Sequence, residues 1–147
     1  MTHLRAARST DAGTIGAIFS EFTDTTDWMP CLHTRAEDIG HAGELIERGW
    51  VTVAERDGVV IGFISCDGAQ IDALYVRCRE RGHGVGSALL ADVCSNAVQL
   101  GLWTFQANVR TIAFYEGKGF VEVARTDGAG TEEKLPDVQF EWQREAM

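Results

Sequence analysis

The chain has 147 residues, 45% of them hydrophobic, which suits one globular domain, and we expect residues 1–147 to form a single domain. The net charge of −9 excludes nucleic acid and membrane surfaces as general partners, because both require a basic surface. Without a long apolar run or a signal-peptide core near the N-terminus, we expect a cytoplasmic protein. The four cysteines are scattered, and Cys31, His33 and His41 fit no zinc spacing, so we expect reduced thiols and no metal.

Hydrophobic periodicity predicts the element order β-α-α-β-β-β-α-β-α-β-β. In chain order the elements cover residues 3–8, 9–22, 34–49, 50–55, 59–66, 69–76, 85–100, 102–107, 109–119, 120–126 and 138–144. The first helix has Ser9 or Thr10 available as its cap, and the second begins with a capping box of Thr34 and Glu37. The Asp-Gly pair at 57–58 predicts a hairpin. This order indicates the α/β (or α+β) class, a mostly antiparallel sheet with helices on its faces.

A glycine-rich turn separates the strand expected at 69–76 from the helix expected at 85–100. The turn contains Gly82, Gly84 and Gly86, it follows Arg77, Arg79 and Arg81, and the helix carries Val85, Leu89, Val93 and Val98 along one side. A helix N-terminus offers unpaired N–H groups and a partial positive charge, so this arrangement indicates a site for a small anionic ligand such as a phosphate. A glycine-rich turn without a ligand is the alternative.

Two common phosphate-binding motifs do not fit this turn. A P-loop requires a lysine that is missing here, and the dinucleotide pattern G-x-G-x-x-G is replaced by G-x-G-x-G. The remaining pattern, Arg81-x-x-Gly84-x-Gly86, resembles the acetyl-CoA signature of the GNAT N-acetyltransferase superfamily. The stretch NVRTIAFYEGKGF at 108–120 is similar to the closing motif of that family. One departure is Cys78, which stands where the family commonly has a proline.

The resemblance implies a GNAT-like mixed sheet and a particular reaction. The expected enzyme moves an acetyl group from acetyl-CoA, its co-substrate, to a primary amine of a small molecule or peptide, by direct attack in a ternary complex. The alternative is a non-catalytic acyl-CoA-binding or regulatory module of the same fold. The pyrophosphate is expected on the turn amides and the pantetheine arm along the strand before it. The cofactor-binding residues that the resemblance implies are Leu74, Val76, Arg81, Gly82, Gly84, Val85, Gly86, Ser87 and Asn108, with Arg110 near the adenine-phosphate end.

The resemblance also implies a proton donor for the leaving group. Tyr115 stands where family members place the phenol that hydrogen-bonds the sulfur and acts as general acid. A tyrosine packed in the core beside Phe114 is the alternative explanation of the same residue. A ping-pong route through an acetylated Cys78 is a further alternative, which intact mass would reveal.

The base and the acceptor site are less constrained by the sequence. Strict alternation puts Asp72 on one face of its strand with Gln70, Leu74 and Val76. There Asp72 acts as the base or as a water relay, or else it has a role in substrate recognition or in the structure. Trp28 and His33 are the expected acceptor-binding residues, and His33 is a second candidate base. Acidic residues of the same segment and of the late loop suit an ammonium-bearing acceptor, and each can also be explained as a solvated loop residue. These are Asp24, Asp27, Asp127, Glu132 and Glu133. The last strands offer an interface for a possible homodimer.

Overall fold

The computed structural model describes residues 2–144, so residues 1 and 145–147 of the expected domain lie outside the described part. Its strands are β1 (His3–Ala6), β2 (Val51–Arg56), β3 (Val59–Asp67), β4 (Gln70–Val76), β5 (Gln99–Phe105), β6 (Val121–Thr126) and β7 (Asp137–Gln143). Its helices are α1 (Ala12–Thr25), α2 (Arg35–Glu47), α3 (Val85–Ser95) and α4 (Val109–Gly117), with short 3₁₀ turns η1 (Ser9–Asp11) and η2 (Cys78–Glu80). The predicted order of strands and helices is confirmed.

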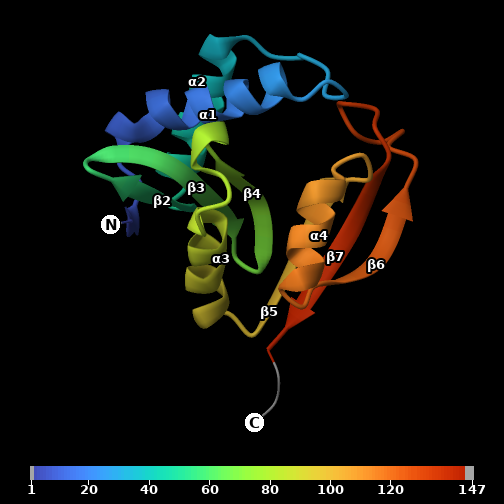
Figure 1. Ribbon diagram of the computed structural model, residues 1–147. Helices are drawn as coiled ribbons and strands as arrows, with labels where there is room; N and C mark the ends of the chain where they lie inside the picture. The colour runs from blue at the N-terminus through green and yellow to red at the C-terminus, as the bar shows by residue number, and fades with distance from the viewer. Residues whose placement is uncertain (1, 145–147) are drawn as a thin grey trace.

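The seven strands form one sheet in the order β1-β2-β3-β4-β5-β7-β6. Neighbouring strands are antiparallel except β4 and β5, which run parallel because α3 crosses between them. The mixed, mostly antiparallel sheet with flanking helices is therefore confirmed. Figure 1 shows α3 and α4 on the near face of the sheet, with α1 and α2 behind and above the β1–β4 half.

Each face of the sheet has its own hydrophobic core. On the α1–α2 face the core includes Ile15, Ile18, Ala42, Leu45, Val53 and Phe63. On the α3–α4 face it includes Leu89, Leu90, Leu100, Leu102, Tyr115, Phe120, Val138 and Phe140. Packing on one face therefore positions α1 and α2 against β2–β4, and packing on the other positions α3 and α4 against the sheet that includes β5.

Local sequence signals set several of the element ends. Thr34 caps α2 by accepting from the Glu37 amide at 3.1 Å, while Glu37 accepts from the Thr34 amide at 2.9 Å, so the capping box is confirmed. The β2–β3 hairpin turns at Asp57 and Gly58, whose φ values of 54° and 79° are those of the tight turn that Asp-Gly favours.

Two local predictions are wrong. Neither Ser9 nor Thr10 caps the first helix, because both lie in η1 and α1 begins only after Asp11, whose carboxylate accepts from the Arg8 amide at 2.7 Å. The third helix ends at Ser95, so Val98 lies beyond it with 77% of its surface exposed. The Asn96 side chain hydrogen-bonds the Asp92 carbonyl at 3.0 Å, which competes with continuation of the helix.

Candidate active site

The site begins where two parallel strands separate. β4 and β5 pair only through Gln70 with Gly101 and Ile71 with Leu102, and they diverge after that. The Arg77 amide donates to the Ile61 carbonyl of β3 at 2.9 Å, so it points away from the gap. Since successive residues of a strand direct their N–H and C=O groups to opposite sides, Val76 and Leu74 direct theirs into the gap. An extended ligand has an unpaired strand edge to bind there.

The N-terminus of α3 lies at the same end of β4. Gly82 and Gly84 have φ values of 79° and 81°, a left-handed conformation that glycine adopts without strain. Gly84 is the N-cap residue and no side chain caps the helix; its carbonyl accepts from the Ala88 amide at 3.0 Å. The amides of residues 85–87 precede the first intrahelical bond, so they have no partner within the helix and remain available to an anion.

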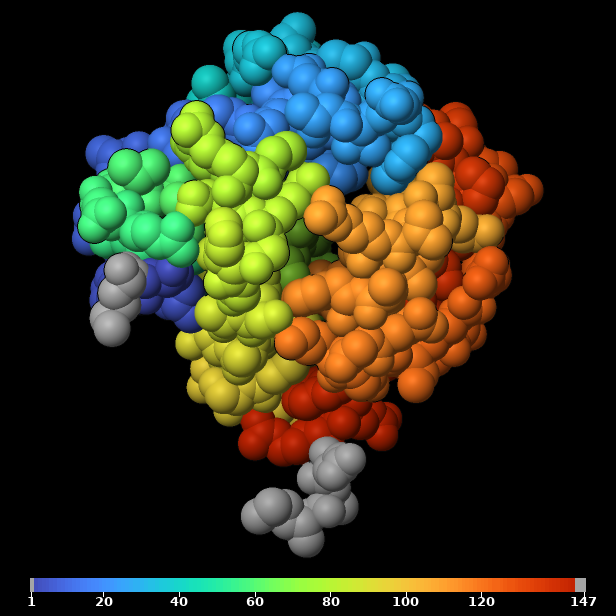
Figure 2. Space-filling model, in the orientation of Figure 1, coloured from blue at the N-terminus to red at the C-terminus, as the bar shows by residue number. Residues whose placement is uncertain are grey.

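A cavity of about 660 Å³ joins the strand gap to this helix N-terminus. Figure 2 shows it as a hollow between the yellow-green surface of residues around α3 and the orange surface of α4, with green β4 at its floor. The predicted donor-binding residues all line it, namely Leu74, Val76, Arg81, Gly82, Gly84, Val85, Gly86, Ser87 and Asn108, together with Arg110. The structure therefore brings this set together in one cavity.

Asn108 has a structural role beside its place in the cavity. It is the N-cap residue of α4, and its side-chain oxygen accepts from the Thr111 amide at 3.4 Å. This contact orients the side chain and leaves the amide NH₂ group free of that bond. At Gly86 an added methyl group would meet Phe114 and Val76 only at 3.7–3.8 Å, so packing within the protein does not demand glycine there.

Asp72 lies at a β-bulge, which strict alternation did not predict. Ser65 pairs with Ala73 and Cys66 with Ile71, so Asp72 is the extra residue of β4. The bulge moves Ile71 into the α3–α4 core, whereas Ala73 lies in the α1–α2 core. Asp72 itself is exposed and lines the cavity, as Leu74 and Val76 do. Ile71 shares the α3–α4 face with Leu74 and Val76, so Gln70, the residue before it, faces the other side and the expectation that Gln70 shares this face is wrong.

Tyr115 is packed in the core, as one of its two explanations predicted, and it also borders the cavity. Its ring is 4% exposed and packs edge-on against Phe114 and Phe120, so it belongs to the core. It also lines the cavity. Burial raises the pKa of its phenol above the ordinary value, so the hydroxyl keeps its proton at neutral pH. Tyr75 of β4 lines the same cavity, and burial, with smaller contributions from the charges of Asp72 and Glu133, raises its pKa to about 12.

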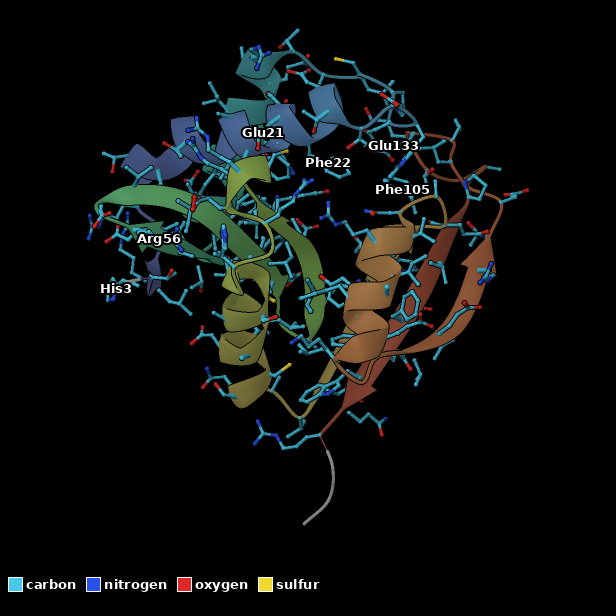
Figure 3. The ribbon with its side chains drawn as sticks, in the orientation of Figure 1. His3, Glu21, Phe22, Arg56, Phe105 and Glu133 are labelled. Carbon is cyan, nitrogen blue, oxygen red and sulfur yellow. The ribbon has the colours of Figure 1, made fainter. Side chains whose placement is uncertain are left out.

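Aromatic side chains form the other end of the cavity. Phe22 of α1 contacts Tyr75 with ring centroids 4.9 Å apart, and Trp28 contacts Phe22 at 6.1 Å and Phe105 at 5.7 Å. Figure 3 shows Phe22 near the end of α1 and Phe105 near the upper end of α4, with Glu133 above Phe105. Trp28 therefore spans the opening between α1 and the end of β5.

The structure separates the two expected acceptor residues. Trp28 lines the main cavity, but His33 lies in a neighbouring pocket of about 210 Å³. There its Nε2 contacts Glu132 Oε1 at 2.8 Å, which links the α1–α2 loop to the β6–β7 loop. The side chain is 45% exposed and is held by this contact. The geometry gives His33 a structural contact and does not place it in the main cavity.

Some residues that line the cavity were not predicted from the sequence. Trp103 and Thr104 of β5 line the cavity, and Trp103 is 43% exposed. The alternation of β5, in which Leu100 and Leu102 are buried, could have shown that Trp103 points away from the core. β5 separates from β4 at this point because of the pairing between strands far apart in the sequence. Hydrophobic periodicity within one segment does not predict such pairing.

Two further features concern residues 2–144 only. In this range no cluster of three or more His, Cys, Asp or Glu side chains is arranged to hold a metal ion. None of the helices described is both long and apolar enough to span a membrane.

Comparisons with known proteins agree with this architecture. The family model described as an acetyltransferase (GNAT) domain matches residues 47–122. The peptidyl-lysine N-acetyltransferase YjaB of Escherichia coli is 30% identical over 126 residues, 84% of this chain and 85% of that protein. The peptidyl-lysine N-acetyltransferase YiaC of Escherichia coli is 33% identical over 98 residues, 65% of this chain and 63% of that protein.

Solved structures show the same fold. The solution structure of apo YjaB from Escherichia coli superposes with a TM-score of 0.81 at 23% identity, covering 96% of this chain and 97% of that one. The structure of yncA from Salmonella typhimurium with its cofactor acetyl-CoA gives a TM-score of 0.77 at 19% identity, covering 100% and 96%. The fold and its site define an acyl-group transferase of the acetyltransferase class. The chain belongs to the GNAT acetyltransferase family, which confirms the resemblance found in the sequence.

Proposed function

We propose that this protein transfers the acetyl group of acetyl-CoA to the side-chain amine of a lysine in a peptide or protein. The observation that carries the proposal is the continuity of the cavity, which joins an open strand edge at Leu74 and Val76 to the free amides of α3. This combination suits a long ligand with an amide-rich arm and a phosphate end. The names of the relatives YjaB and YiaC support lysine as the acceptor.

The donor half of the cavity fits coenzyme A in charge as well as in shape. Arg81 and Arg110 line it together with the α3 amides, although the chain carries a net charge of −9. Left-handed Gly84 removes the side chain from the point where the backbone turns into the helix. We assign the pyrophosphate to the amides of residues 82–87 and the pantetheine amides to the exposed edge of β4.

The reaction needs a neutral amine, a polarised carbonyl and a stabilised leaving group. When the amine attacks, a C–N bond forms, the C–S bond breaks and the sulfur leaves as a thiolate. Tyr115 donates a hydrogen bond to that sulfur. An ordinary thiol pKa of about 8.5 lies below that of even an unperturbed phenol, about 10, so the tyrosine stabilises the thiolate mainly by hydrogen bonding. The proton that completes the free thiol comes from the attacking amine.

Asp72 is the carboxylate nearest in sequence to this strand edge, and its exposure in the cavity makes it available to the amine. We assign it the removal of the proton from the lysine ammonium, directly or through water, or the recognition of that ammonium. Asp27 and Trp28 form the opposite wall, where negative charge and an aromatic face both attract a cation. The kinetics of Asp72→Asn separate the two roles, because loss of a base lowers kcat whereas loss of a recognition group raises KM.

The test is an assay of acetyl transfer to lysine-containing peptides, in which released thiol measures the rate and the mass of the peptide identifies the product. Tyr115→Phe should lower kcat about 100-fold while leaving the Kd of acetyl-CoA within twofold. Phe120→Leu, which changes a ring packed against Tyr115 at 5.1 Å, leaves the phenol intact and lies outside the cavity lining, is the control for packing. Acetyl-CoA binding without transfer to any amine would instead favour the non-catalytic module, and transfer only to free small amines would limit the acceptor to small molecules.

A further inference from the structure

Helix α1 is tied directly to the segment that leads into the anion-binding turn. Glu21 Oε1 accepts a hydrogen bond from the Cys78 amide at 2.9 Å, across 57 positions of sequence. The Thr25 hydroxyl, one turn further along α1, lies 3.7 Å from the Cys78 sulfur. Figure 3 shows Glu21 where α1 meets the turn after β4. Cys78 is three residues before Arg81, so the contact is made at the entrance of the donor site.

The same part of α1 forms the opposite end of the cavity. Phe22, Thr25 and the following residues 26–28 all line it. Upstream, Ile15 and Ile18 are buried in the α1–α2 core and hold the helix to the sheet. The last turns of α1 have fewer anchors, because beyond Phe22 the residues are half-buried or exposed. Asp24 pairs with Arg35 of α2 at 2.8 Å, and the hydrogen bond of Glu21, beside the longer Thr25–Cys78 contact, sets this end of α1 against the donor turn.

We propose that Glu21 is a positioning residue that couples the acceptor end of the cavity to the donor turn. A carboxylate that accepts from a backbone N–H forms a charge-assisted bond, which is short and directional. When acetyl-CoA orders the turn after Cys78, this bond orders Phe22 and Trp28 with it. The donor turn has a second anchor in the ion pair of Arg56 with Glu80 at 2.5 Å, so the turn stays in place when Glu21 is removed.

The chain offers an unusually specific way to remove this bond. Cys78 is the first residue of η2, where proline is tolerated, and Arg77 before it has φ −53° and ψ 140°, which is compatible with a following proline. Cys78→Pro therefore deletes the N–H donor and keeps the backbone path. Cys78→Ala is the matched control, because it deletes the thiol and keeps the N–H.

The kinetic part of the inference rests on the proposed function. We expect Glu21→Ala and Cys78→Pro each to raise the KM for the acceptor peptide about tenfold, since a hydrogen bond to a charged group contributes on this scale, while the Kd of acetyl-CoA stays within twofold. Cys78→Ala should behave as wild type, and Glu21→Gln, which keeps a carbonyl acceptor, should restore most of the affinity. Glu44→Ala on the exposed surface of α2 controls for loss of a carboxylate.

The double variant makes the inference falsifiable even if one substitution harms folding in other ways. In the Cys78→Pro background, Glu21→Ala should have no further effect on KM, because the bond is already absent. Additive effects would overturn the proposal, as would an equal rise in the KM of both substrates. Hydrogen exchange supplies a readout that needs no turnover. Acetyl-CoA should protect amides 22–28 in wild type and Cys78→Ala, and less in Cys78→Pro. If wild type fails to acetylate lysine but shows this pattern, the acceptor assignment fails and the coupling stands.

Discussion

Replacing Gly84 by alanine isolates the contribution of one backbone conformation to acetyl-CoA binding. Its φ of 81° is left-handed, and an added Cβ would meet nothing within 4 Å, so the substitution costs conformational energy without a clash. A left-handed residue with a side chain costs about 1–2 kcal/mol, and alanine offsets about 0.4–1 kcal/mol by restricting the unfolded chain. We therefore expect a loss of about 1 kcal/mol in the free energy of unfolding, or about 2–4 °C in Tm.

The loss in the free energy of acetyl-CoA binding should exceed this loss in the free energy of unfolding. If the turn relaxes and even one charge-assisted bond to the pyrophosphate is lost, Kd rises about tenfold or more. At a ligand concentration 100 times the wild-type Kd, acetyl-CoA stabilises wild type by about 2.7 kcal/mol, and a tenfold weaker variant by about 1.4 kcal/mol. Gly58→Ala is the matched control, with φ 79°, no atom within 4 Å and a position in the β2–β3 hairpin. Thermal unfolding with and without acetyl-CoA measures both quantities. Full ligand stabilisation of Gly84→Ala would refute the assignment of this turn.

Three further predictions concern the stability contributed by Asp11, the role of Asp72 in the reaction, and the backbone at Gly128. Hydrogen bonding to Arg5, with the Arg8 amide also contributing, holds the pKa of Asp11 below its ordinary 3.8, so its stabilisation is present above that pH and lost as pH falls through the lower folded value. Asp11→Asn should thus cost about 2 kcal/mol at pH 7 and progressively less below pH 4 in urea unfolding; a constant difference would contradict this. Asp72→Asn should lower kcat about 100-fold if the carboxylate is the base, and raise only KM if it recognises the ammonium. Gly128→Ala puts a Cβ 2.0 Å from the Leu135 carbonyl oxygen at φ 80°, so we expect a loss above about 3 kcal/mol, checked against Gly130→Ala, where space is open.

Signals carried by neighbouring residues predicted much of this fold. Thr34 and Glu37 specify the start of α2, and Asp57 with Gly58 specifies a hairpin, because both depend only on local backbone geometry. The anion-binding turn was predictable for the same reason. Its glycines, its arginines and the apolar run of α3 are contiguous, and the chemistry of a helix N-terminus is local.

The acceptor end could not be predicted in this way. Trp28 reaches Phe105 across the opening, whereas His33, only five positions later, turns to Glu132 in another pocket. Loop residues of similar composition were indistinguishable in the sequence, because their positions depend on which distant segment each one contacts. The bulge at Asp72 was hidden as well, since it arises from the register between β3 and β4 and leaves no mark on the alternation within β4.

The sequence by itself determined the glycine turn and the start of α3, to which we assign the pyrophosphate, because both are encoded by adjacent residues. Only the tertiary structure decided what lies opposite that turn. The separation of β4 from β5, the aromatic wall from α1, and the hydrogen bond between Glu21 and Cys78 all join residues far apart in the chain. Packing on both faces of the sheet fixes these contacts, and the pattern of any one segment does not contain them.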